Sequence, residues 1–68
     1  MTKYSHTLHI PADMLYPSER PRMILWLASY NLPPDAAYRV YRTWCDAVGE
    51  TVSRADLDDL CGPEYNVT

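Results

Sequence analysis

The sequence predicts a mainly α, compact three-helix domain that follows an extended N-terminal segment or short strand. Apolar residues recur with helical spacing over residues 35–48, which is the clearest periodic segment of the chain. Prolines, glycines and capping residues divide residues 18–62 into three helical segments, and 68 residues suffice for one domain. We therefore expect an extended segment over residues 1–17, a three-helix core and a tail over residues 63–68. A small α+β domain is the alternative.

The N-terminal segment carries a strand pattern. Side chains over Tyr4–Ile10 alternate between two faces, and Pro11 ends the run. A single strand is not stable alone, so this one needs a second strand of the chain, a second copy or the sheet edge of a partner. Residues 65–68 are the other short strand candidate, and residues 12–15 are compatible with one helical turn.

The first helix is expected to begin at Ser18, whose side chain is a good helix cap, and to tolerate Pro21 in its first turn. It should continue to about Tyr30, because Asn31 is a suitable left-handed stop. The run over residues 23–27 is by itself equally compatible with a buried strand. The length of the segment and the cap favour a helix.

This first helix is apolar around almost its whole circumference, which is unusual in a small protein. A chain of 68 residues is too short to surround such a helix completely. Either the helix lies between the N-terminal segment and the central helix, or part of it is exposed and binds a partner. Its apolar residues are Met23, Ile24, Leu25, Trp26, Leu27, Ala28 and Tyr30.

The central helix, Asp35–Val48, has one apolar and one polar face. Pro34 fits its first turn, and Gly49 is expected to end it. Cys45 and Tyr38 lie on the border between the faces. The apolar face comprises Ala36, Ala37, Val40, Tyr41, Trp44, Ala47 and Val48, and the polar face comprises Arg39, Arg42, Thr43 and Asp46.

The third helix is predicted from a capping pattern. Ser53 is followed three residues later by Asp56, as at many helix starts. The helix should run to about Cys61 and stop at Gly62, with a narrow apolar stripe that includes Leu57 and Leu60.

The charge is uneven along the chain. The net charge is −3, and residues 46–68 carry six carboxylates against one arginine. Residues 1–45 carry five basic against three acidic side chains. An acidic protein has little nonspecific affinity for nucleic acids, whereas its acidic half is suited to a basic partner.

No apolar run follows the lysine near the N-terminus as a secretory signal requires, and no apolar stretch approaches the roughly 18 residues of a membrane span. We therefore expect a cytoplasmic protein, without a cofactor, in which Cys45 and Cys61 are reduced thiols. A disulfide between them is the alternative in an oxidising compartment.

The chain has metal-binding residue types but not their usual spacing. His6 and His9, together with the two cysteines, supply zinc-ligand atoms, but the histidines fall on opposite faces of the predicted strand. The acidic run at residues 56–59 fails the calcium-loop pattern, since Leu60 occupies a ligand position. We predict no metal site.

Catalytic motifs are also missing from the sequence. No serine or cysteine stands in a nucleophile motif, and the only glycines, Gly49 and Gly62, cannot form a phosphate-binding loop. We do not expect an enzyme.

The sequence instead favours a small non-enzymatic protein-interaction module, a regulator or inhibitor that docks on a larger protein or dimerises. Tyr, Trp, Met and Arg, which are enriched in interface cores, are abundant in the chain, and the first helix has more apolar surface than the chain can bury. The alternative for Trp26 is packing on Trp44 in the core. The candidate partner-binding residues are Arg22, Met23, Trp26 and Tyr30, with Asp56, Asp58 and Asp59 as a second, acidic surface.

The alternative function is DNA binding by a helix-turn-helix, with residues 34–48 as the first helix and 53–61 as the second. The second helix would carry a net charge of −2, which phosphates repel. The basic residues for this alternative are Arg20, Arg22, Arg39 and Arg42.

Overall fold

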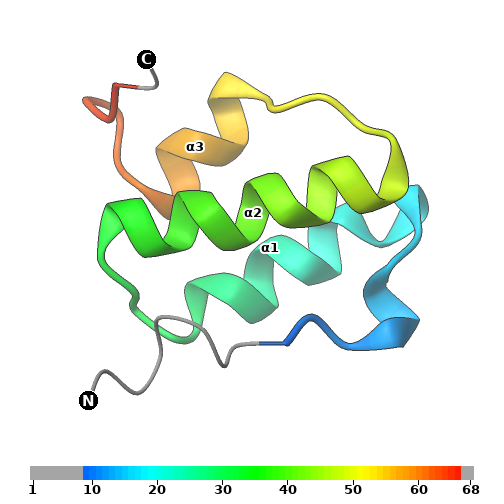
Figure 1. Cartoon of the computed structure of the whole chain (residues 1–68). Helices are drawn as coiled ribbons and strands as arrows, with labels where there is room; N and C mark the ends of the chain where they lie inside the picture. Colours follow the sequence, from blue (N-terminus) through cyan, green and yellow to red (C-terminus); the bar gives the residue numbers. More distant parts are fainter. Residues whose placement is uncertain (1–8, 67–68) are drawn as a thin grey trace.

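The computed structural model describes residues 9–66 as an all-α domain of three helices (Figure 1). These are α1 (Arg20–Ala28), α2 (Pro34–Val48) and α3 (Arg54–Leu60). The described residues contain no strand. The strand predicted over Tyr4–Ile10 lies outside the described residues up to Leu8, and its last two residues, His9 and Ile10, are not in a strand.

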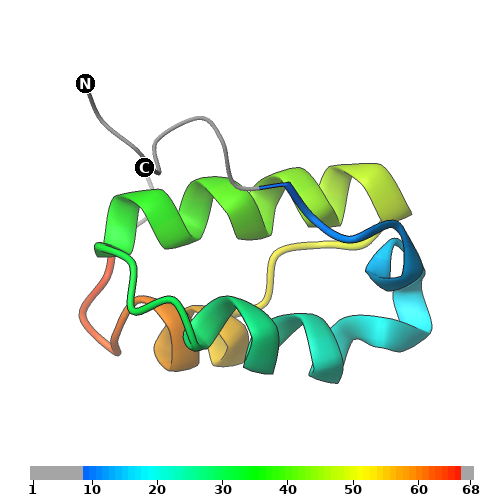
Figure 2. The ribbon, with the colours of Figure 1, turned by 90° about the horizontal axis from the view of Figure 1, so that it is seen from below.

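The helices form two layers. Figure 2 shows α2 on one side and α1 with α3 on the other, so that the longest helix covers both shorter ones. Each helix packs against the other two. Within the described residues, none of the helices has the length and apolar character needed to cross a membrane.

The start of α1 differs from the prediction. Ser18 lies inside a 3-10 turn over Pro17–Glu19, and the N-cap of α1 is Glu19, without a side-chain cap. The proposed Ser18 cap is therefore wrong, because Pro17 begins a turn one residue earlier and an N-cap residue must itself be non-helical.

The end of α1 was predicted more closely. The helix ends at Ala28, where the Ser29 hydroxyl donates a 2.6 Å hydrogen bond to the Trp26 carbonyl. Asn31 then adopts a positive φ of 52°, which confirms it as the left-handed stop.

The bounds of α2 and α3 confirm the predictions. Gly49 ends α2 with a φ of 77°, and its N–H donates to the Cys45 carbonyl. Ser53 caps α3, since its hydroxyl accepts a 3.4 Å hydrogen bond from the Asp56 N–H. Helix ends in this part of the chain follow directly from local residue types.

The core lies between the two layers. The Trp44 indole donates a 2.6 Å hydrogen bond to the Met14 carbonyl, and this bond joins the N-terminal 3-10 turn (Ala12–Met14) to α2. Cys45, predicted at the border of the apolar face, is buried, whereas Ala47 is exposed. The buried side chains are Met14, Met23, Leu27, Ala37, Tyr41, Trp44, Cys45 and Leu57.

The segment after α3 folds back onto the domain. Arg54 donates hydrogen bonds to the carbonyls of Gly62, Pro63 and Tyr65, at 3.3, 3.2 and 2.8 Å. The Tyr65 hydroxyl donates to Asp35 at 2.9 Å. Arg54 thus satisfies three carbonyls and holds this segment beside α3, while Tyr65 holds it beside the start of α2.

Candidate functional site

The outward side of α1 is apolar. Met23 and Leu27 point into the core, so the residues on the opposite side of the helix face solvent. Leu25 is 73% exposed, which is the highest value among the large hydrophobic residues described. We call Pro21, Ile24, Leu25 and Ala28 the outer face of α1; Ile24 among them is half-buried.

A groove separates this outer face from α3. We call it the α1/α3 groove. Its α1 wall is largely apolar, whereas its α3 wall consists of two carboxylates. The lining residues are Arg20, Pro21, Ile24, Leu25, Asp56 and Asp59.

A polar network closes the inner side of the groove. Arg20 forms an ion pair with Asp56 and donates to Glu50 at 3.3 Å and to the Thr51 carbonyl at 3.0 Å. Its guanidinium also lies over the Trp44 ring, 5.5 Å from the centroid. Arg20 therefore ties α1 to the loop before α3 and to the core.

Tyr41 completes this network from α2. Its hydroxyl donates to Asp56 at 2.7 Å and accepts from Arg20 at 3.2 Å and from the Ser53 N–H at 2.9 Å. These three bonds use the full capacity of a hydroxyl group. Burial raises the pKa of Tyr41 well above its ordinary value, so the group stays a neutral donor. The hydroxyl therefore has no free hydrogen-bonding position and links α1, α2 and the start of α3.

The three predicted acidic residues have different surroundings. Asp56 is held by Arg20 and Tyr41, and Asp58 pairs with Arg54 at 2.9 Å. Asp59 is exposed, and residues 9–66 place no cation within ion-pair distance of it. Asp59 is thus the carboxylate of this group that is available to a partner.

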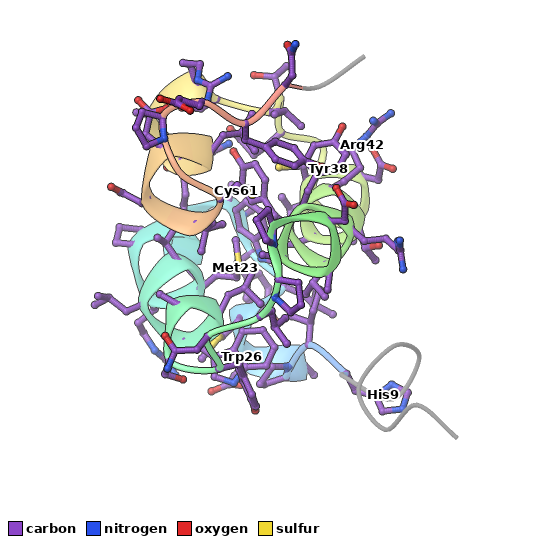
Figure 3. All side chains as sticks on the ribbon, turned by 90° about the vertical axis from the view of Figure 1, so that its left-hand side faces the viewer. His9, Met23, Trp26, Tyr38, Arg42 and Cys61 are labelled. Carbon is purple, nitrogen blue, oxygen red and sulfur yellow. The ribbon has the colours of Figure 1, made fainter. Side chains whose placement is uncertain are left out.

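The predicted anchors Met23, Trp26 and Tyr30 differ in burial, and Tyr30 lies just after the end of α1. Met23 is 0% exposed and lies in the interior, whereas Trp26 lies at the edge of the molecule (Figure 3). Trp26 is half-buried and contacts Tyr30 edge to face, with 5.3 Å between ring centroids, and Tyr30 is 47% exposed. We therefore assign Met23 to the core and keep Trp26 and Tyr30 as surface candidates beside the outer face.

Arg22 lies at the N-terminal rim of this surface. It is exposed and pairs with Asp13 at 3.1 Å and with Glu19 at 2.9 Å. The rim therefore has more negative than positive charge even where an arginine is present.

Most of the residues proposed for DNA binding already have carboxylate partners within the chain. Arg20 and Arg22 are engaged as described, and Arg42 contacts Asp46 at 3.5 Å and the Tyr38 hydroxyl at 3.1 Å. Arg39 is exposed, and no carboxylate of residues 9–66 pairs with it. Three of the four guanidiniums thus already have carboxylate partners within the chain.

The two cysteine thiols lie near opposite ends of α2, Cys45 within α2 itself and Cys61 at the end of α3. The Cys45 thiol contacts the Thr51 carbonyl at 3.8 Å, and the Cys61 thiol contacts the Pro34 carbonyl at 3.4 Å. Pro34 and Cys45 are separated along α2 by about 16 Å at 1.5 Å per residue. Both thiols are free, and burial raises the pKa of each.

The residues considered for zinc do not come together in the described part of the chain. His6 lies outside the described residues, and Figure 3 shows His9 far from Cys61. Residues 9–66 contain no group of three or more His, Cys, Asp or Glu side chains placed to hold a metal ion.

Comparisons with protein-family models, curated proteins and solved structures give no significant match. The surface of this chain is therefore the basis for a functional assignment. Leu25, which is central to that surface, was missed in the sequence. A helix that is apolar on all sides does not reveal which side faces the core. The sequence indicated the exposure of Leu25 only through its position two residues from both Met23 and Leu27, which places it on the opposite side of the helix.

Proposed function

We propose that this protein is a non-enzymatic interaction module, a regulator or inhibitor that docks on a larger protein through the outer face of α1. The observation that carries the proposal is the 73% exposure of Leu25, next to Pro21, Ile24 and Ala28 on the same face. A single exposed leucine is ordinary, but an apolar helix face that no element of residues 9–66 covers is typical of a binding surface.

The residues around the outer face support this proposal. The Trp26–Tyr30 pair offers partly exposed aromatic rings on one flank, and Arg22 lies at the rim. Apolar centres with aromatic neighbours and a polar rim are the usual composition of protein interfaces.

The charges favour a different protein over a second copy of this chain. A two-fold symmetric contact brings each residue of the patch close to the same patch on the other subunit. Here that contact would bring two acidic surroundings together, including both copies of Asp59. Like charges at an interface oppose association.

Quantitative capture with a matched control tests the proposal. The wild-type protein, Leu25→Ser and Tyr16→Ser are compared as baits in extracts of the cells that encode the protein. Tyr16 is 59% exposed but lies outside α1, so its variant removes a similar exposed apolar side chain from another place. We expect a protein that wild type and Tyr16→Ser both retain and that Leu25→Ser loses. Equal capture by all three baits would contradict the proposal.

DNA binding is the second candidate, and the ion pairs of Arg20, Arg22 and Arg42 weaken it. Binding to duplex DNA that falls steeply with salt and is lost in the double variant Arg39→Glu/Arg42→Glu would favour DNA binding over docking.

A further inference from the structure

We propose that the α1/α3 groove receives an amphipathic helix of the partner, with lysine or arginine along the edge that faces α3. This inference rests on the proposed docking function and names the chemistry of the partner segment. It starts from the two unlike walls of the groove: Ile24 and Leu25 on α1, and Asp59 on α3.

The charges around the groove favour a positively charged partner segment. Glu50 and Asp56 pair with Arg20, and Asp59 lines the same groove without a cation of its own among residues 9–66, so these four side chains have a net charge of −2. Asp56 is already neutralised by Arg20 at close range, so Asp59 is the group that gains most from a cation. Charge complementarity of this kind speeds encounter and sets orientation.

A second charged group in the first turn of α1, outside the groove, has the same sign. Arg22 is shared between two carboxylates, Asp13 and Glu19, which leaves a local net charge of −1. Both sides of the apolar outer face are therefore acidic. A partner with apolar residues at the centre and basic residues at both edges matches this arrangement.

The occupant should be a helix rather than an extended peptide. An extended peptide needs a sheet edge to satisfy its backbone, and residues 9–66 offer none. A polyproline segment needs an aromatic-lined groove, whereas no aromatic residue lines this one. A helix satisfies its own backbone and presents side chains at i, i+3, i+4 and i+7 to such a groove.

The sizes also agree. The nine residues of α1 span about 13 Å at 1.5 Å per residue. A partner helix lying alongside contacts this length with about two and a half turns. Its apolar stripe would contact Ile24 and Leu25, and a basic residue three or four positions away would reach Asp59.

Three synthetic helical peptides test this inference. They share one leucine and alanine face and carry lysine, glutamine or glutamate at the flanking positions. Affinities are measured by isothermal titration calorimetry at low and high salt with wild type, Asp59→Asn and Leu25→Ser. Asp46→Asn is the matched control, because Asp46 is an exposed carboxylate on α2, away from the groove.

We expect the lysine peptide to bind about five-fold or more tightly than the glutamine peptide at low salt, and the glutamate peptide to bind most weakly. Asp59→Asn should reduce the preference for lysine, and high salt should reduce it further, whereas Asp46→Asn should leave it unchanged. Leu25→Ser should weaken all three peptides.

Equal affinity of the lysine and glutamine peptides, or no measurable binding of any peptide, would overturn this inference. An unchanged lysine preference in Asp59→Asn would overturn the assignment to the groove. These outcomes do not test the docking function itself, which the capture experiment tests separately. Loss of the captured protein in Leu25→Ser would then show docking by a partner of another kind, and equal capture would show that both proposals fail.

Discussion

At the scale of single residues, the Tyr41 hydroxyl connects all three helices. It joins α2 to Arg20 of α1, to Asp56 of α3 and to the Ser53 N–H at the start of α3. These groups are 12 to 21 residues away in sequence, so no local pattern reveals the network. In the sequence, Tyr41 was recognisable only as a member of an apolar face.

Tyr41→Phe should lower the free energy of unfolding by about 1–3 kcal/mol, because the Ser53 N–H loses its acceptor in a partly buried place. Urea denaturation should show a lower midpoint with an unchanged slope. Tyr30→Phe is the control, since Tyr30 is 47% exposed and its variant should change stability by less than about 0.5 kcal/mol. Equal midpoints for wild type and Tyr41→Phe would contradict the role of the hydroxyl.

The same hydroxyl makes stability depend on alkaline pH. Burial raises the pKa of Tyr41 well above its ordinary value of 10.0 and outweighs the hydrogen bond from the Ser53 N–H, which lowers it. The folded state therefore holds a proton that the unfolded chain loses near pH 10. The stabilisation from this group is complete below pH 10 and falls as the pH rises further.

Urea denaturation at a series of pH values up to about 11 measures this dependence. The difference in unfolding free energy between wild type and Tyr41→Phe should be constant below about pH 9.5 and should shrink above pH 10. A difference in unfolding free energy that grows above pH 10 would contradict a raised pKa of Tyr41 in the folded state.

At the scale of elements, helix ends were the most predictable features. Gly49, Asn31 and Ser53 stop or start helices through local conformations that their residue types favour. The start of α1 was not predictable in this way, because Pro17 placed a 3-10 turn before the expected cap. The core-facing side of α1 was also hidden, since a helix that is apolar all round has no pattern to orient it.

Gly49→Ala should destabilise the protein by about 1–2 kcal/mol, because Gly49 has a φ of 77° that disfavours a β-carbon. An added β-carbon meets no atom within 4 Å, so the cost is conformational rather than steric contact with neighbours. Gly49→Asn should cost less, since asparagine tolerates the left-handed region better than alanine. Equal thermal stability of wild type and Gly49→Ala would contradict a left-handed end of α2.

At the scale of the whole molecule, Leu57 and Leu25 are at opposite extremes of burial. Leu57 is 3% exposed and is the buried residue of α3, whereas Leu25 is 73% exposed. A domain of this size has only about 3–5 kcal/mol of net stability. Replacing a side chain that serves the fold should therefore lower the free energy of unfolding by a large part of this total, whereas replacing a side chain that serves binding should change it little.

Leu57→Ala should cost about 2–5 kcal/mol and unfold much of the protein, because it opens a cavity in the core. Leu25→Ser should change the free energy of unfolding by less than about 0.5 kcal/mol. Circular dichroism during thermal and urea denaturation measures both variants. A strongly destabilised Leu25→Ser would show that the outer face of α1 supports the fold instead of being free for a partner.

The most direct measurement of the docking function is site-specific photocrosslinking in the cells that encode the protein. A photoreactive amino acid replaces Leu25 on the outer face of α1 or, as a control, Arg39 on the exposed side of α2. We expect position 25 to form a crosslink to one protein and position 39 to form none to that protein. The same crosslinks from both positions, or none from position 25, would contradict docking through α1.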